Sequence, residues 1–389
     1  MRVSDIQVIQ SGCFCEVRAE VRFHTLWVWG DKPFVLFYRL PIDVVDYLNR
    51  ENGDRFVAAL LDPAMLLGEE LRIEAAVSAQ LFTAVPTIQS IYGRWNEDFQ
   101  TVPVTAGARL ESTKSNVETG PGIGLFFFMG VDSSYNLAKN LDAHPNDEST
   151  ISHLIVTEGF DVYLWKTGRF PPMLEQIERV GKIFGKSVLP AATNLRDVSD
   201  RIVSWDGLQC GPALASIVLA LEPMFRRVHI SAGQTYSLLT AVGVHPLVDP
   251  LWSSEQVTFV HNGLEADWLA KVKFLGRYPD LVENLRVCNA IDETGVYNCG
   301  ECEKCLRTML NLHVVGMLTR CATLPHSINP DRIGVLAVSN PNLILQLESA
   351  LAKLGSSPED ARIRAAIRES LARSNSRPRY LQPAYQGDA

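Results

Sequence analysis

The chain has 389 residues, of which 47% are hydrophobic and 21% are charged, an ordinary composition for a globular protein. Its net charge of −8 disfavours general nucleic-acid binding, because the field of the whole molecule would repel a polyanion. The first residues lack the basic start and apolar core of a signal peptide, and no apolar run approaches the ~20 residues that span a bilayer. We therefore expect a cytoplasmic protein with no membrane partner, and the composition leaves its oligomeric state open.

Residues 1–110 are predicted to form a β-rich N-terminal domain. Residues 15–23 alternate between apolar and polar side chains, which is typical of a strand with one solvated face. Further aromatic and β-branched strand segments are expected at 26–29 and 34–38, and helices at 43–48 and 54–61. This part of the chain carries no recognisable chemical motif, so its expected role is to shape a neighbouring site or to recruit a partner.

A polar linker at 111–122 precedes a predicted α/β domain at 123–330. Strands are expected at 124–128, 151–157, 187–190 and 228–231, with helices ending near 141 and spanning 171–184 and 211–221. Strands that alternate with helices of this length predict a parallel sheet covered on both faces. Another helix is expected at 303–315. Residues 331–389 are predicted to be a helical appendage that ends in a disordered tail of about fifteen residues.

Four cysteines near the end of this domain have the spacing C-x10-C-x2-C-x2-C, at positions Cys288, Cys299, Cys302 and Cys305. A tetrahedral zinc site with Zn–S bonds of about 2.3 Å needs four sulfurs roughly 3.8 Å apart, and such a knuckle is consistent with Gly300 between two of the ligands. An iron–sulfur cluster is the alternative ligand-based interpretation. Disulfides are disfavoured in a reducing cytosol. We expect a structural Zn²⁺ site, because four protein ligands leave no open coordination position.

The loop after the first strand of this domain is the best candidate for an anion site. Its residues are Met129, Gly130, Val131, Asp132, Ser133 and Ser134. Ligands of open parallel sheets bind beyond the carboxyl ends of the strands, and the start of the following helix would present N–H donors to a phosphate. The serines add hydroxyl groups, and Asp132 would bind a phosphate-bridging Mg²⁺ or orient the loop. A plain strand–helix turn with an N-cap at Asp132 or Ser133 fits the same residues.

This order of elements resembles the PP-loop ATP pyrophosphatases, and within them the 7-cyano-7-deazaguanine synthases. Those proteins open a parallel sheet with a loop of the form SGGxDS and end it with a CGxCxxC cysteine cluster. The resemblance covers roughly residues 122–315 and implies a Rossmann-like sheet of the HUP type. Gly130, Asp132 and Ser133 match the loop motif, whereas Phe128 and Met129 replace its first Ser and first Gly. That departure removes a hydroxyl and puts bulky side chains where a phosphate would approach.

The resemblance implies an ATP-dependent, AMP-forming enzyme with ATP, Mg²⁺ and a structural Zn²⁺. It would adenylate a carboxylate or carbonyl of a deazapurine-like heterocyclic acid and transfer a nitrogen nucleophile to form an amide or nitrile, as in queuosine-like biosynthesis. In one alternative the same activation modifies a protein amine or installs sulfur, in a defence or secondary-metabolite setting. In another the chain is a nucleotide-binding pseudoenzyme or an assembly subunit, which Phe128 and Met129 favour.

The resemblance also assigns nucleotide contacts beyond the loop. Val156 and Thr157 end the second strand, where backbone groups of such folds face adenine. Gly233 follows the fourth strand, where a small residue lets the nucleotide pass. Lys271 would neutralise charge that develops on the α-phosphate, although a solvated lysine is the plain alternative.

A polar segment between the fourth strand and the cysteines occupies the place of the family's substrate-contacting loop. Asp249 or Glu255 would accept hydrogen bonds from a guanine-like edge, and Trp252 would stack on the ring. His245 would transfer a proton near neutral pH. The alternative for each is an ordinary loop residue or a packed aromatic ring.

Overall fold

The computed structural model describes residues 1–48, 52–110, 120–145, 147–288, 297–336, 338 and 340–375. Most of the predicted linker and nearly all of the predicted disordered tail lie outside these residues. Among the helices described, none combines the length and the apolar character that a membrane span requires.

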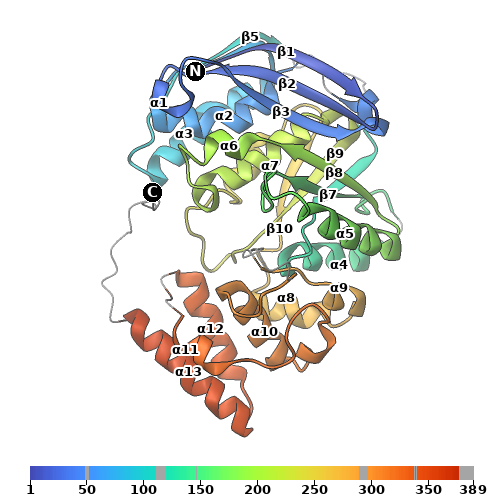
Figure 1. Ribbon diagram of the computed structural model, residues 1–389, viewed down its shortest axis with the longest axis vertical. Helices are drawn as coiled ribbons and strands as arrows, with labels where there is room; N and C mark the ends of the chain where they lie inside the picture. Colours follow the sequence, from blue (N-terminus) through green and yellow to red (C-terminus); the bar gives the residue numbers. More distant parts are fainter. Residues whose placement is uncertain are drawn as a thin grey trace.

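The described strands form one ten-stranded sheet that runs through the upper part of the molecule (Figure 1). Its spatial order is β10-β9-β6-β7-β8-β3-β2-β1-β4-β5. The strands are β1 (Arg2–Ser11), β2 (Phe14–Arg22), β3 (Phe34–Pro41), β4 (Leu71–Ser78), β5 (Val104–Leu110), β6 (Gly122–Phe126), β7 (His153–Glu158), β8 (Ser187–Thr193), β9 (Phe225–Ser231) and β10 (Thr258–Asn262). Strands β10 to β8 are parallel to one another, β8, β3, β2 and β1 pair antiparallel, and β1, β4 and β5 are again parallel. The predicted α/β class with a mostly parallel sheet is confirmed.

The parallel half reverses its strand order between β6 and β9. Strands β7 and β8 follow β6 on one side, and β9 and β10 lie on the other, so the loops after β6 and β9 flank a switch point where open sheets bind ligands. Its connecting helices are α4 (Val131–Ala143), α5 (Phe170–Phe184), α6 (Leu195–Ser199) and α7 (Cys210–Leu219). The strands and longer helices predicted for this half are therefore present, with boundaries shifted by a few residues.

The remaining helices cover the N-terminal strands or form the lower part of the molecule (Figure 1). The N-terminal helices are α1 (Leu26–Trp29), α2 (Asp54–Leu67) and α3 (Ala79–Trp95). The C-terminal helices are α8 (Trp268–Leu275), α9 (Pro279–Glu283), α10 (Glu303–Val314), α11 (Pro330–Gly334), α12 (Pro341–Lys353) and α13 (Pro358–Asn375). Short helical turns are η1 (Ile42–Tyr47), η2 (Trp205–Gln209), η3 (Glu222–Met224), η4 (Asp249–Trp252) and η5 (Leu318–Arg320). Segment 26–29, predicted as a strand, is instead the single-turn helix α1.

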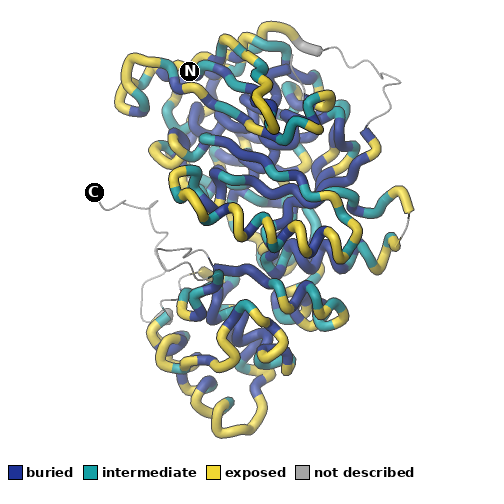
Figure 2. The backbone as a smooth tube through the Cα atoms, turned by 45° about the vertical axis from the view of Figure 1, so that its right-hand side comes forward, coloured by how far each residue is buried: buried dark blue, intermediate teal, exposed yellow. Residues whose placement is uncertain are grey.

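Two hydrophobic cores lie on opposite faces of the parallel strands, as alternation along β7 shows. Leu154 and Val156 belong to the core under α4, α5 and α10, whereas Ile155 belongs to the core shared with α2 and α7. Burial of both faces removes most of the polar alternation from these strands and explains their continuous apolar sequence. Figure 2 shows the same pattern, with dark buried strands in the interior and exposed turns on the outer helices.

The N-terminal strands extend the same sheet, because β3 pairs with β8. In β2 the side chains of Cys15, Val17 and Ala19 are buried, which confirms the predicted alternation, and the buried face packs on α2. Helix α2 is buried along nearly its whole length, so even its polar side chains are shielded from solvent. The N-terminal region therefore supplies one of the two layers that enclose the sheet.

The carboxyl group of Asp62 is enclosed in this layer. The side chain is fully buried, and both oxygens lack a hydrogen-bond partner among the residues that the structure describes. Burial raises the pKa of Asp62 well above its ordinary value of 3.8, because the low-dielectric interior disfavours the carboxylate. The folded protein thus binds a proton here that the unfolded chain releases near pH 4.

We expect Asp62→Asn to stabilise the protein more at pH 8 than at pH 5. A raised folded-state pKa contributes stability that is complete below the unfolded pKa and declines as pH rises toward the folded value, by at most about 1.4 kcal/mol per pH unit. The amide of the Asp62→Asn variant does not titrate, so this decline in stability with rising pH is absent from the variant. Chemical denaturation of both proteins across this pH range measures the difference. Asp98→Asn, at an exposed position, is the control; an equal pH dependence in wild type and Asp62→Asn would contradict the expectation.

Candidate functional site

A cavity of about 280 Å³ lies at the switch point of the parallel strands. The loop after β6 contributes Phe128, Gly130 and Asp132, and Gly233 contributes from the end of β9. Asp161 contributes from the loop after β7, and the other lining residues come from the start of α8, the segment that ends at Cys288 and the helix α10. The structure therefore brings the predicted phosphate loop, Gly233 and the cysteine cluster to one hollow.

Met129 occupies the position of a motif glycine and adopts the backbone conformation that glycine favours, with φ of 59°. Its side chain is only 1% exposed and packs in the core under α4, so it does not fill the cavity. The hydroxyl of Tyr297 lies 3.7 Å from its sulfur, and its carbonyl accepts a 2.9 Å hydrogen bond from the amide of Arg286. Of the two departures from the motif, only Phe128 borders the space that a ligand would enter.

The serines of the loop turn inward with the first turn of α4. Ser133 Oγ donates a 3.2 Å hydrogen bond to the carbonyl of Gly130. Ser134 is 1% exposed, and no described residue offers its hydroxyl a partner. Neither serine is among the residues that line the cavity. Gly130, Val131 and Asp132 do line it, at the start of α4, where the first amides of a helix have no partner within the helix.

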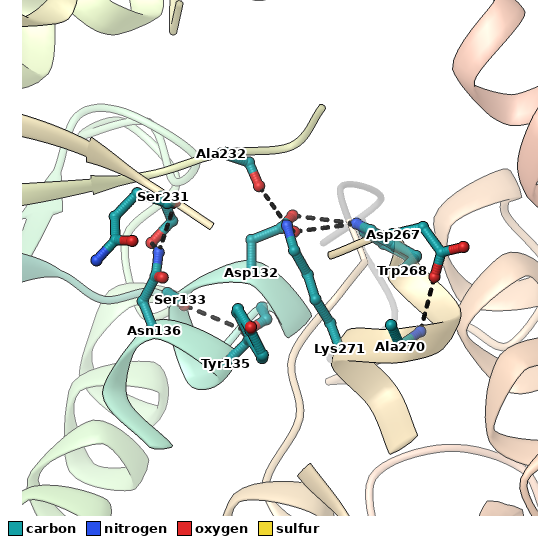
Figure 3. Close-up of polar contacts among 12 residues, drawn as sticks. Asp132, Ser133, Tyr135, Asn136, Ser231, Ala232, Asp267, Trp268, Ala270 and Lys271 are labelled. Carbon is teal, nitrogen blue, oxygen red and sulfur yellow. Dashed lines mark hydrogen bonds and ion pairs between the residues drawn. The ribbon is translucent and has the colours of Figure 1, made fainter. Parts of the chain in front are cut away.

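Asp132 is held from two sides by residues of α8 (Figure 3). Lys271 Nζ lies 2.6 Å from Asp132 Oδ1 and also donates to the carbonyl of Ala232 at 2.6 Å. Trp268 Nε1 donates to the same carboxylate at 3.1 Å. Lys271 is 1% exposed, so this ion pair joins the loops after β6 and β9 to α8. Lys271 therefore acts first on Asp132, rather than pointing as a solvated charge toward a ligand.

Three cations that sequence reasoning missed also line the cavity, namely Arg286, Lys304 and Arg307. Arg286 is 5% exposed, lies 3.8 Å from the carboxylate of Asp161, and keeps one guanidinium nitrogen without a partner among the described residues. The guanidinium carbon of Arg307 lies 3.8 Å from the ring centre of Trp268. The sequence contained a signal for these three cations, because each lies within two positions of one of the four cysteines. The lining thus combines three cationic side chains with the carboxylates of Asp132 and Asp161, in a chain whose net charge is −8.

The four cysteines meet at one point, which confirms the predicted ligand group. Their sulfurs all lie within 4.8 Å of one another, and the separations of Cys288 from Cys302 and of Cys299 from Cys305 are 3.8 Å and 3.9 Å. Those separations fit one tetrahedral ion such as zinc. In an iron–sulfur cluster the four cysteines are divided between two or more iron atoms, so the sulfurs would not all lie this close together. The backbone fits as well, because Gly300 has φ of 72° at the tight turn.

A buried amide joins the two halves of this metal site. Asn298 Oδ1 accepts hydrogen bonds from the amides of Val287 and Cys288, at 2.9 and 3.1 Å. Its Nδ2 donates to the carbonyls of Leu285 and Thr323, at 2.9 and 3.1 Å. The amide of Arg286, in the same segment as Val287 and Cys288, donates a hydrogen bond to the carbonyl of Met129. This one segment therefore contacts both the cysteine group and the loop after β6.

The predicted substrate segment lies elsewhere, and this corrects the assignment made from the resemblance. Trp252 and Asp249 are fully buried, so Trp252 offers no free face for stacking. Asp249 is paired with His261 at 2.7 Å, and burial raises the pKa of its carboxyl. The ring of His245 packs against Trp95 of α3 at 4.7 Å, and burial lowers its pKa.

Glu255, the fourth residue predicted there, accepts a 2.7 Å hydrogen bond from the amide of Gln80 at the start of α3. His245 and Glu255 therefore contact α3, and none of the four predicted residues lines the cavity. Val156 and Thr157 are also buried in β7 and do not line the cavity. Gly233 does line it, and a methyl group there would meet only Asp132 Oδ2, at 4.0 Å.

Comparison of the chain with protein-family models, with curated proteins and with solved structures finds no match. The function is therefore inferred from the chemistry of the cavity. A switch-point hollow that combines helix N-terminal amides with three cations is suited to a polyanionic ligand, and a triphosphate is the common ligand of that kind.

Proposed function

We propose that this protein is an ATP-dependent, AMP-forming enzyme of the PP-loop type, which binds the triphosphate of ATP in the switch-point cavity. The observation that carries the proposal is the meeting of the Gly130–Asp132 amides with Arg286, Lys304 and Arg307 around one hollow of about 280 Å³. Charge-assisted hydrogen bonds from guanidinium groups are the strongest that a phosphate receives from a protein. The resemblance of the loop and the cysteine spacing to the deazaguanine synthases supports the same reaction class.

The proposed reaction has two displacements. A carboxylate oxygen of the acceptor attacks the α-phosphorus, the bond from that phosphorus to the bridging oxygen breaks, and pyrophosphate leaves with the electron pair. A nitrogen nucleophile then attacks the acyl carbon, loses a proton to water, and AMP leaves. Formation of a nitrile repeats the activation: the amide oxygen attacks the α-phosphorus of a second ATP and pyrophosphate leaves. The bond from carbon to the AMP oxygen then breaks as the nitrogen loses its two protons to water.

The residues of the cavity act on the leaving group in this scheme. Arg286, Lys304 and Arg307 neutralise the charge that grows on pyrophosphate as the bond breaks. Asp132 is held by Lys271 and Trp268, so its role is to fix the loop rather than to abstract a proton. A Mg²⁺ ion would enter with the nucleotide, and Asp132 and Asp161 are the carboxylates of the lining.

Phe128 is the observation that favours the second candidate, a nucleotide-binding subunit without turnover. It borders the cavity at the position where the motif has a serine, so one hydroxyl donor to phosphate is replaced by an apolar ring. In that case the cavity would still bind ATP through its cations, while the α-phosphorus would lack part of its positioning.

The test is to incubate the purified protein with ATP, Mg²⁺, ammonia and 7-carboxy-7-deazaguanine, and to measure pyrophosphate, AMP and new products by mass spectrometry. Equal amounts of AMP and pyrophosphate together with an amide or nitrile would support the proposed enzyme. Acceptor-dependent AMP with primary amines or sulfide in place of ammonia would identify the alternative nucleophiles. Binding of ATP without turnover across a panel of heterocyclic acids would favour the subunit. Failure to bind ATP at all would contradict both.

A further inference from the structure

The four cysteines of the metal group differ in exposure and in their position on the fold. Cys288 and Cys305 are buried, with 2% and 0% of their surfaces exposed, whereas Cys299 and Cys302 are partly exposed. Cys302 is also the N-cap residue of α10, a helix of 12 residues. Reactive cysteines are typically found at such partly exposed helix N-termini. Of the four sulfurs, that of Cys302 is therefore the one most open to an oxidant from solvent.

A second thiolate lies within reach of Cys302. The sulfur of Cys288 is 3.8 Å from the sulfur of Cys302, although the two residues are 14 positions apart. A disulfide bond between them would bring the sulfurs about 1.8 Å closer, because its length is about 2.05 Å. The bond would join the segment that ends at Cys288 to the start of α10.

Both of these segments line the cavity at the switch point. Arg286 lies two positions before Cys288, and Lys304 lies two positions after Cys302. The amide of Arg286 also donates a 2.9 Å hydrogen bond to the carbonyl of Met129 in the loop after β6. A misplacement of about 1 Å disturbs groups that must meet one ligand together. A new bond between the two sulfurs is therefore expected to change the cavity.

We propose that Cys302 and Cys288 form an oxidation site that controls this cavity, with hydrogen peroxide as the oxidant. The Cys302 thiolate attacks a peroxide oxygen, the O–O bond breaks, and hydroxide leaves and takes up a proton to form water. The Cys288 thiolate then attacks the sulfur of the Cys302 sulfenic acid, the S–O bond breaks, and a second hydroxide leaves to form water. The two sulfurs lose two electrons in total, and peroxide gains them.

The disulfide leaves Cys299 and Cys305 as the only thiolates of the group. Two ligands are too few for a structural zinc site, so the oxidised protein releases its ion. A thiol reductant reverses the bond by exchange, which makes the pair a redox switch. The effect of this switch on ATP rests on the proposed function, whereas the oxidation and the change in the cavity do not.

The first test needs no nucleotide. Wild-type protein, purified with its metal, is treated with about one equivalent of hydrogen peroxide, with or without dimedone, a reagent for sulfenic acids. Dimedone should label Cys302 at least about tenfold faster than Cys13, which is exposed but lies outside the group. Without dimedone, peptide mapping should find the Cys288–Cys302 disulfide, together with one released Zn²⁺ per chain. Slower labelling of Cys302, a disulfide that omits either residue, or metal retained beside the disulfide would overturn the inference.

Hydrogen exchange then measures whether the cavity responds. The amide of Arg286 is protected by its hydrogen bond to Met129, so its exchange should become about tenfold faster or more in the oxidised protein. Dithiothreitol with Zn²⁺ should restore the original rate. Amides of the paired strands β1 and β2 are the internal control, and Cys321→Ala and Cys13→Ser should respond as the wild type does. Unchanged exchange at Arg286 in protein that carries the disulfide would overturn control of the cavity.

Titration with a non-hydrolysable ATP analogue separates this inference from the proposed function. The oxidised protein should bind the analogue at least about tenfold more weakly than the reduced protein, and by reciprocity the analogue should raise the affinity for Zn²⁺. Equal affinity of the two forms would overturn the inference and leave the proposed function intact. Failure of the reduced protein to bind the analogue would contradict the proposed function, and exchange of the Arg286 amide would then decide the redox switch alone.

Discussion

Replacing Cys302 by alanine is expected to release the bound metal and to lower the free energy of unfolding by about 4 kcal/mol or more. The reason is that the ion would hold two segments together, the one ending at Cys288 and the one from Cys299 into α10, in addition to the hydrogen bonds of Asn298. Cys302 is partly exposed, so the lost packing of its own side chain contributes little. Elemental analysis of the purified protein and urea denaturation with and without a chelator measure both effects.

Cys321→Ala is the matched control for this prediction. Cys321 is fully buried in the same hydrophobic core but does not belong to the four-sulfur group. Its substitution should cost about 1 kcal/mol and leave the metal content at one ion per chain. Wild-type protein that carries no metal while all its thiols are reduced would contradict the ligand assignment. Iron with inorganic sulfide in place of zinc would favour the cluster interpretation.

Arg286→Gln is expected to weaken ATP binding by about 10- to 100-fold, because it removes a charge-assisted hydrogen-bond donor from a buried phosphate site. Arg286 is suited to this role, since it is 5% exposed and one of its nitrogens has no described partner. Isothermal titration with a non-hydrolysable ATP analogue at fixed ionic strength measures the loss. Arg277→Gln makes the same change of charge at an exposed position outside the cavity and should leave the affinity unchanged.

The same variant separates two roles for the cations. A metal held by four thiolates carries net negative charge, so Arg286, Lys304 and Arg307 also neutralise the metal site that they flank. If Arg286→Gln keeps its metal and loses ATP, the guanidinium acts on phosphate. If it loses metal while ATP affinity is retained, Arg286 is a counterion of the thiolates, and the assignment of the cavity to a triphosphate would be contradicted.

Local patterns predicted well wherever neighbours in sequence are also neighbours in space. The spacing of Cys299, Cys302 and Cys305 identified a ligand group, because three sulfurs on one knuckle need only a tight turn at Gly300 to converge. The strand–helix alternation likewise identified the parallel sheet.

Contacts between segments that are distant in sequence determine which residues form the site. Lys271 and Asp132 are 139 positions apart, and their ion pair depends on the crossing of α8 over the start of α4. Met129 could be interpreted only once its φ of 59° and its burial were known, because the sequence shows a bulky residue but not the direction of its side chain. Asn311 and Gln346 line a small hollow beside Trp268 only because α12 packs on α10.

The sequence by itself determined the group of four cysteines that could hold a metal, the α/β class and the position of the loop that follows the first parallel strand, since each depends on local spacing and periodicity. Only the tertiary structure decided which residues face the cavity. It buried Asp249 and Trp252 beneath α3 and gathered three cations from the metal segment around the loop. The physical reason is that burial and charge proximity depend on which distant surfaces pack together, and that packing is a property of the whole fold.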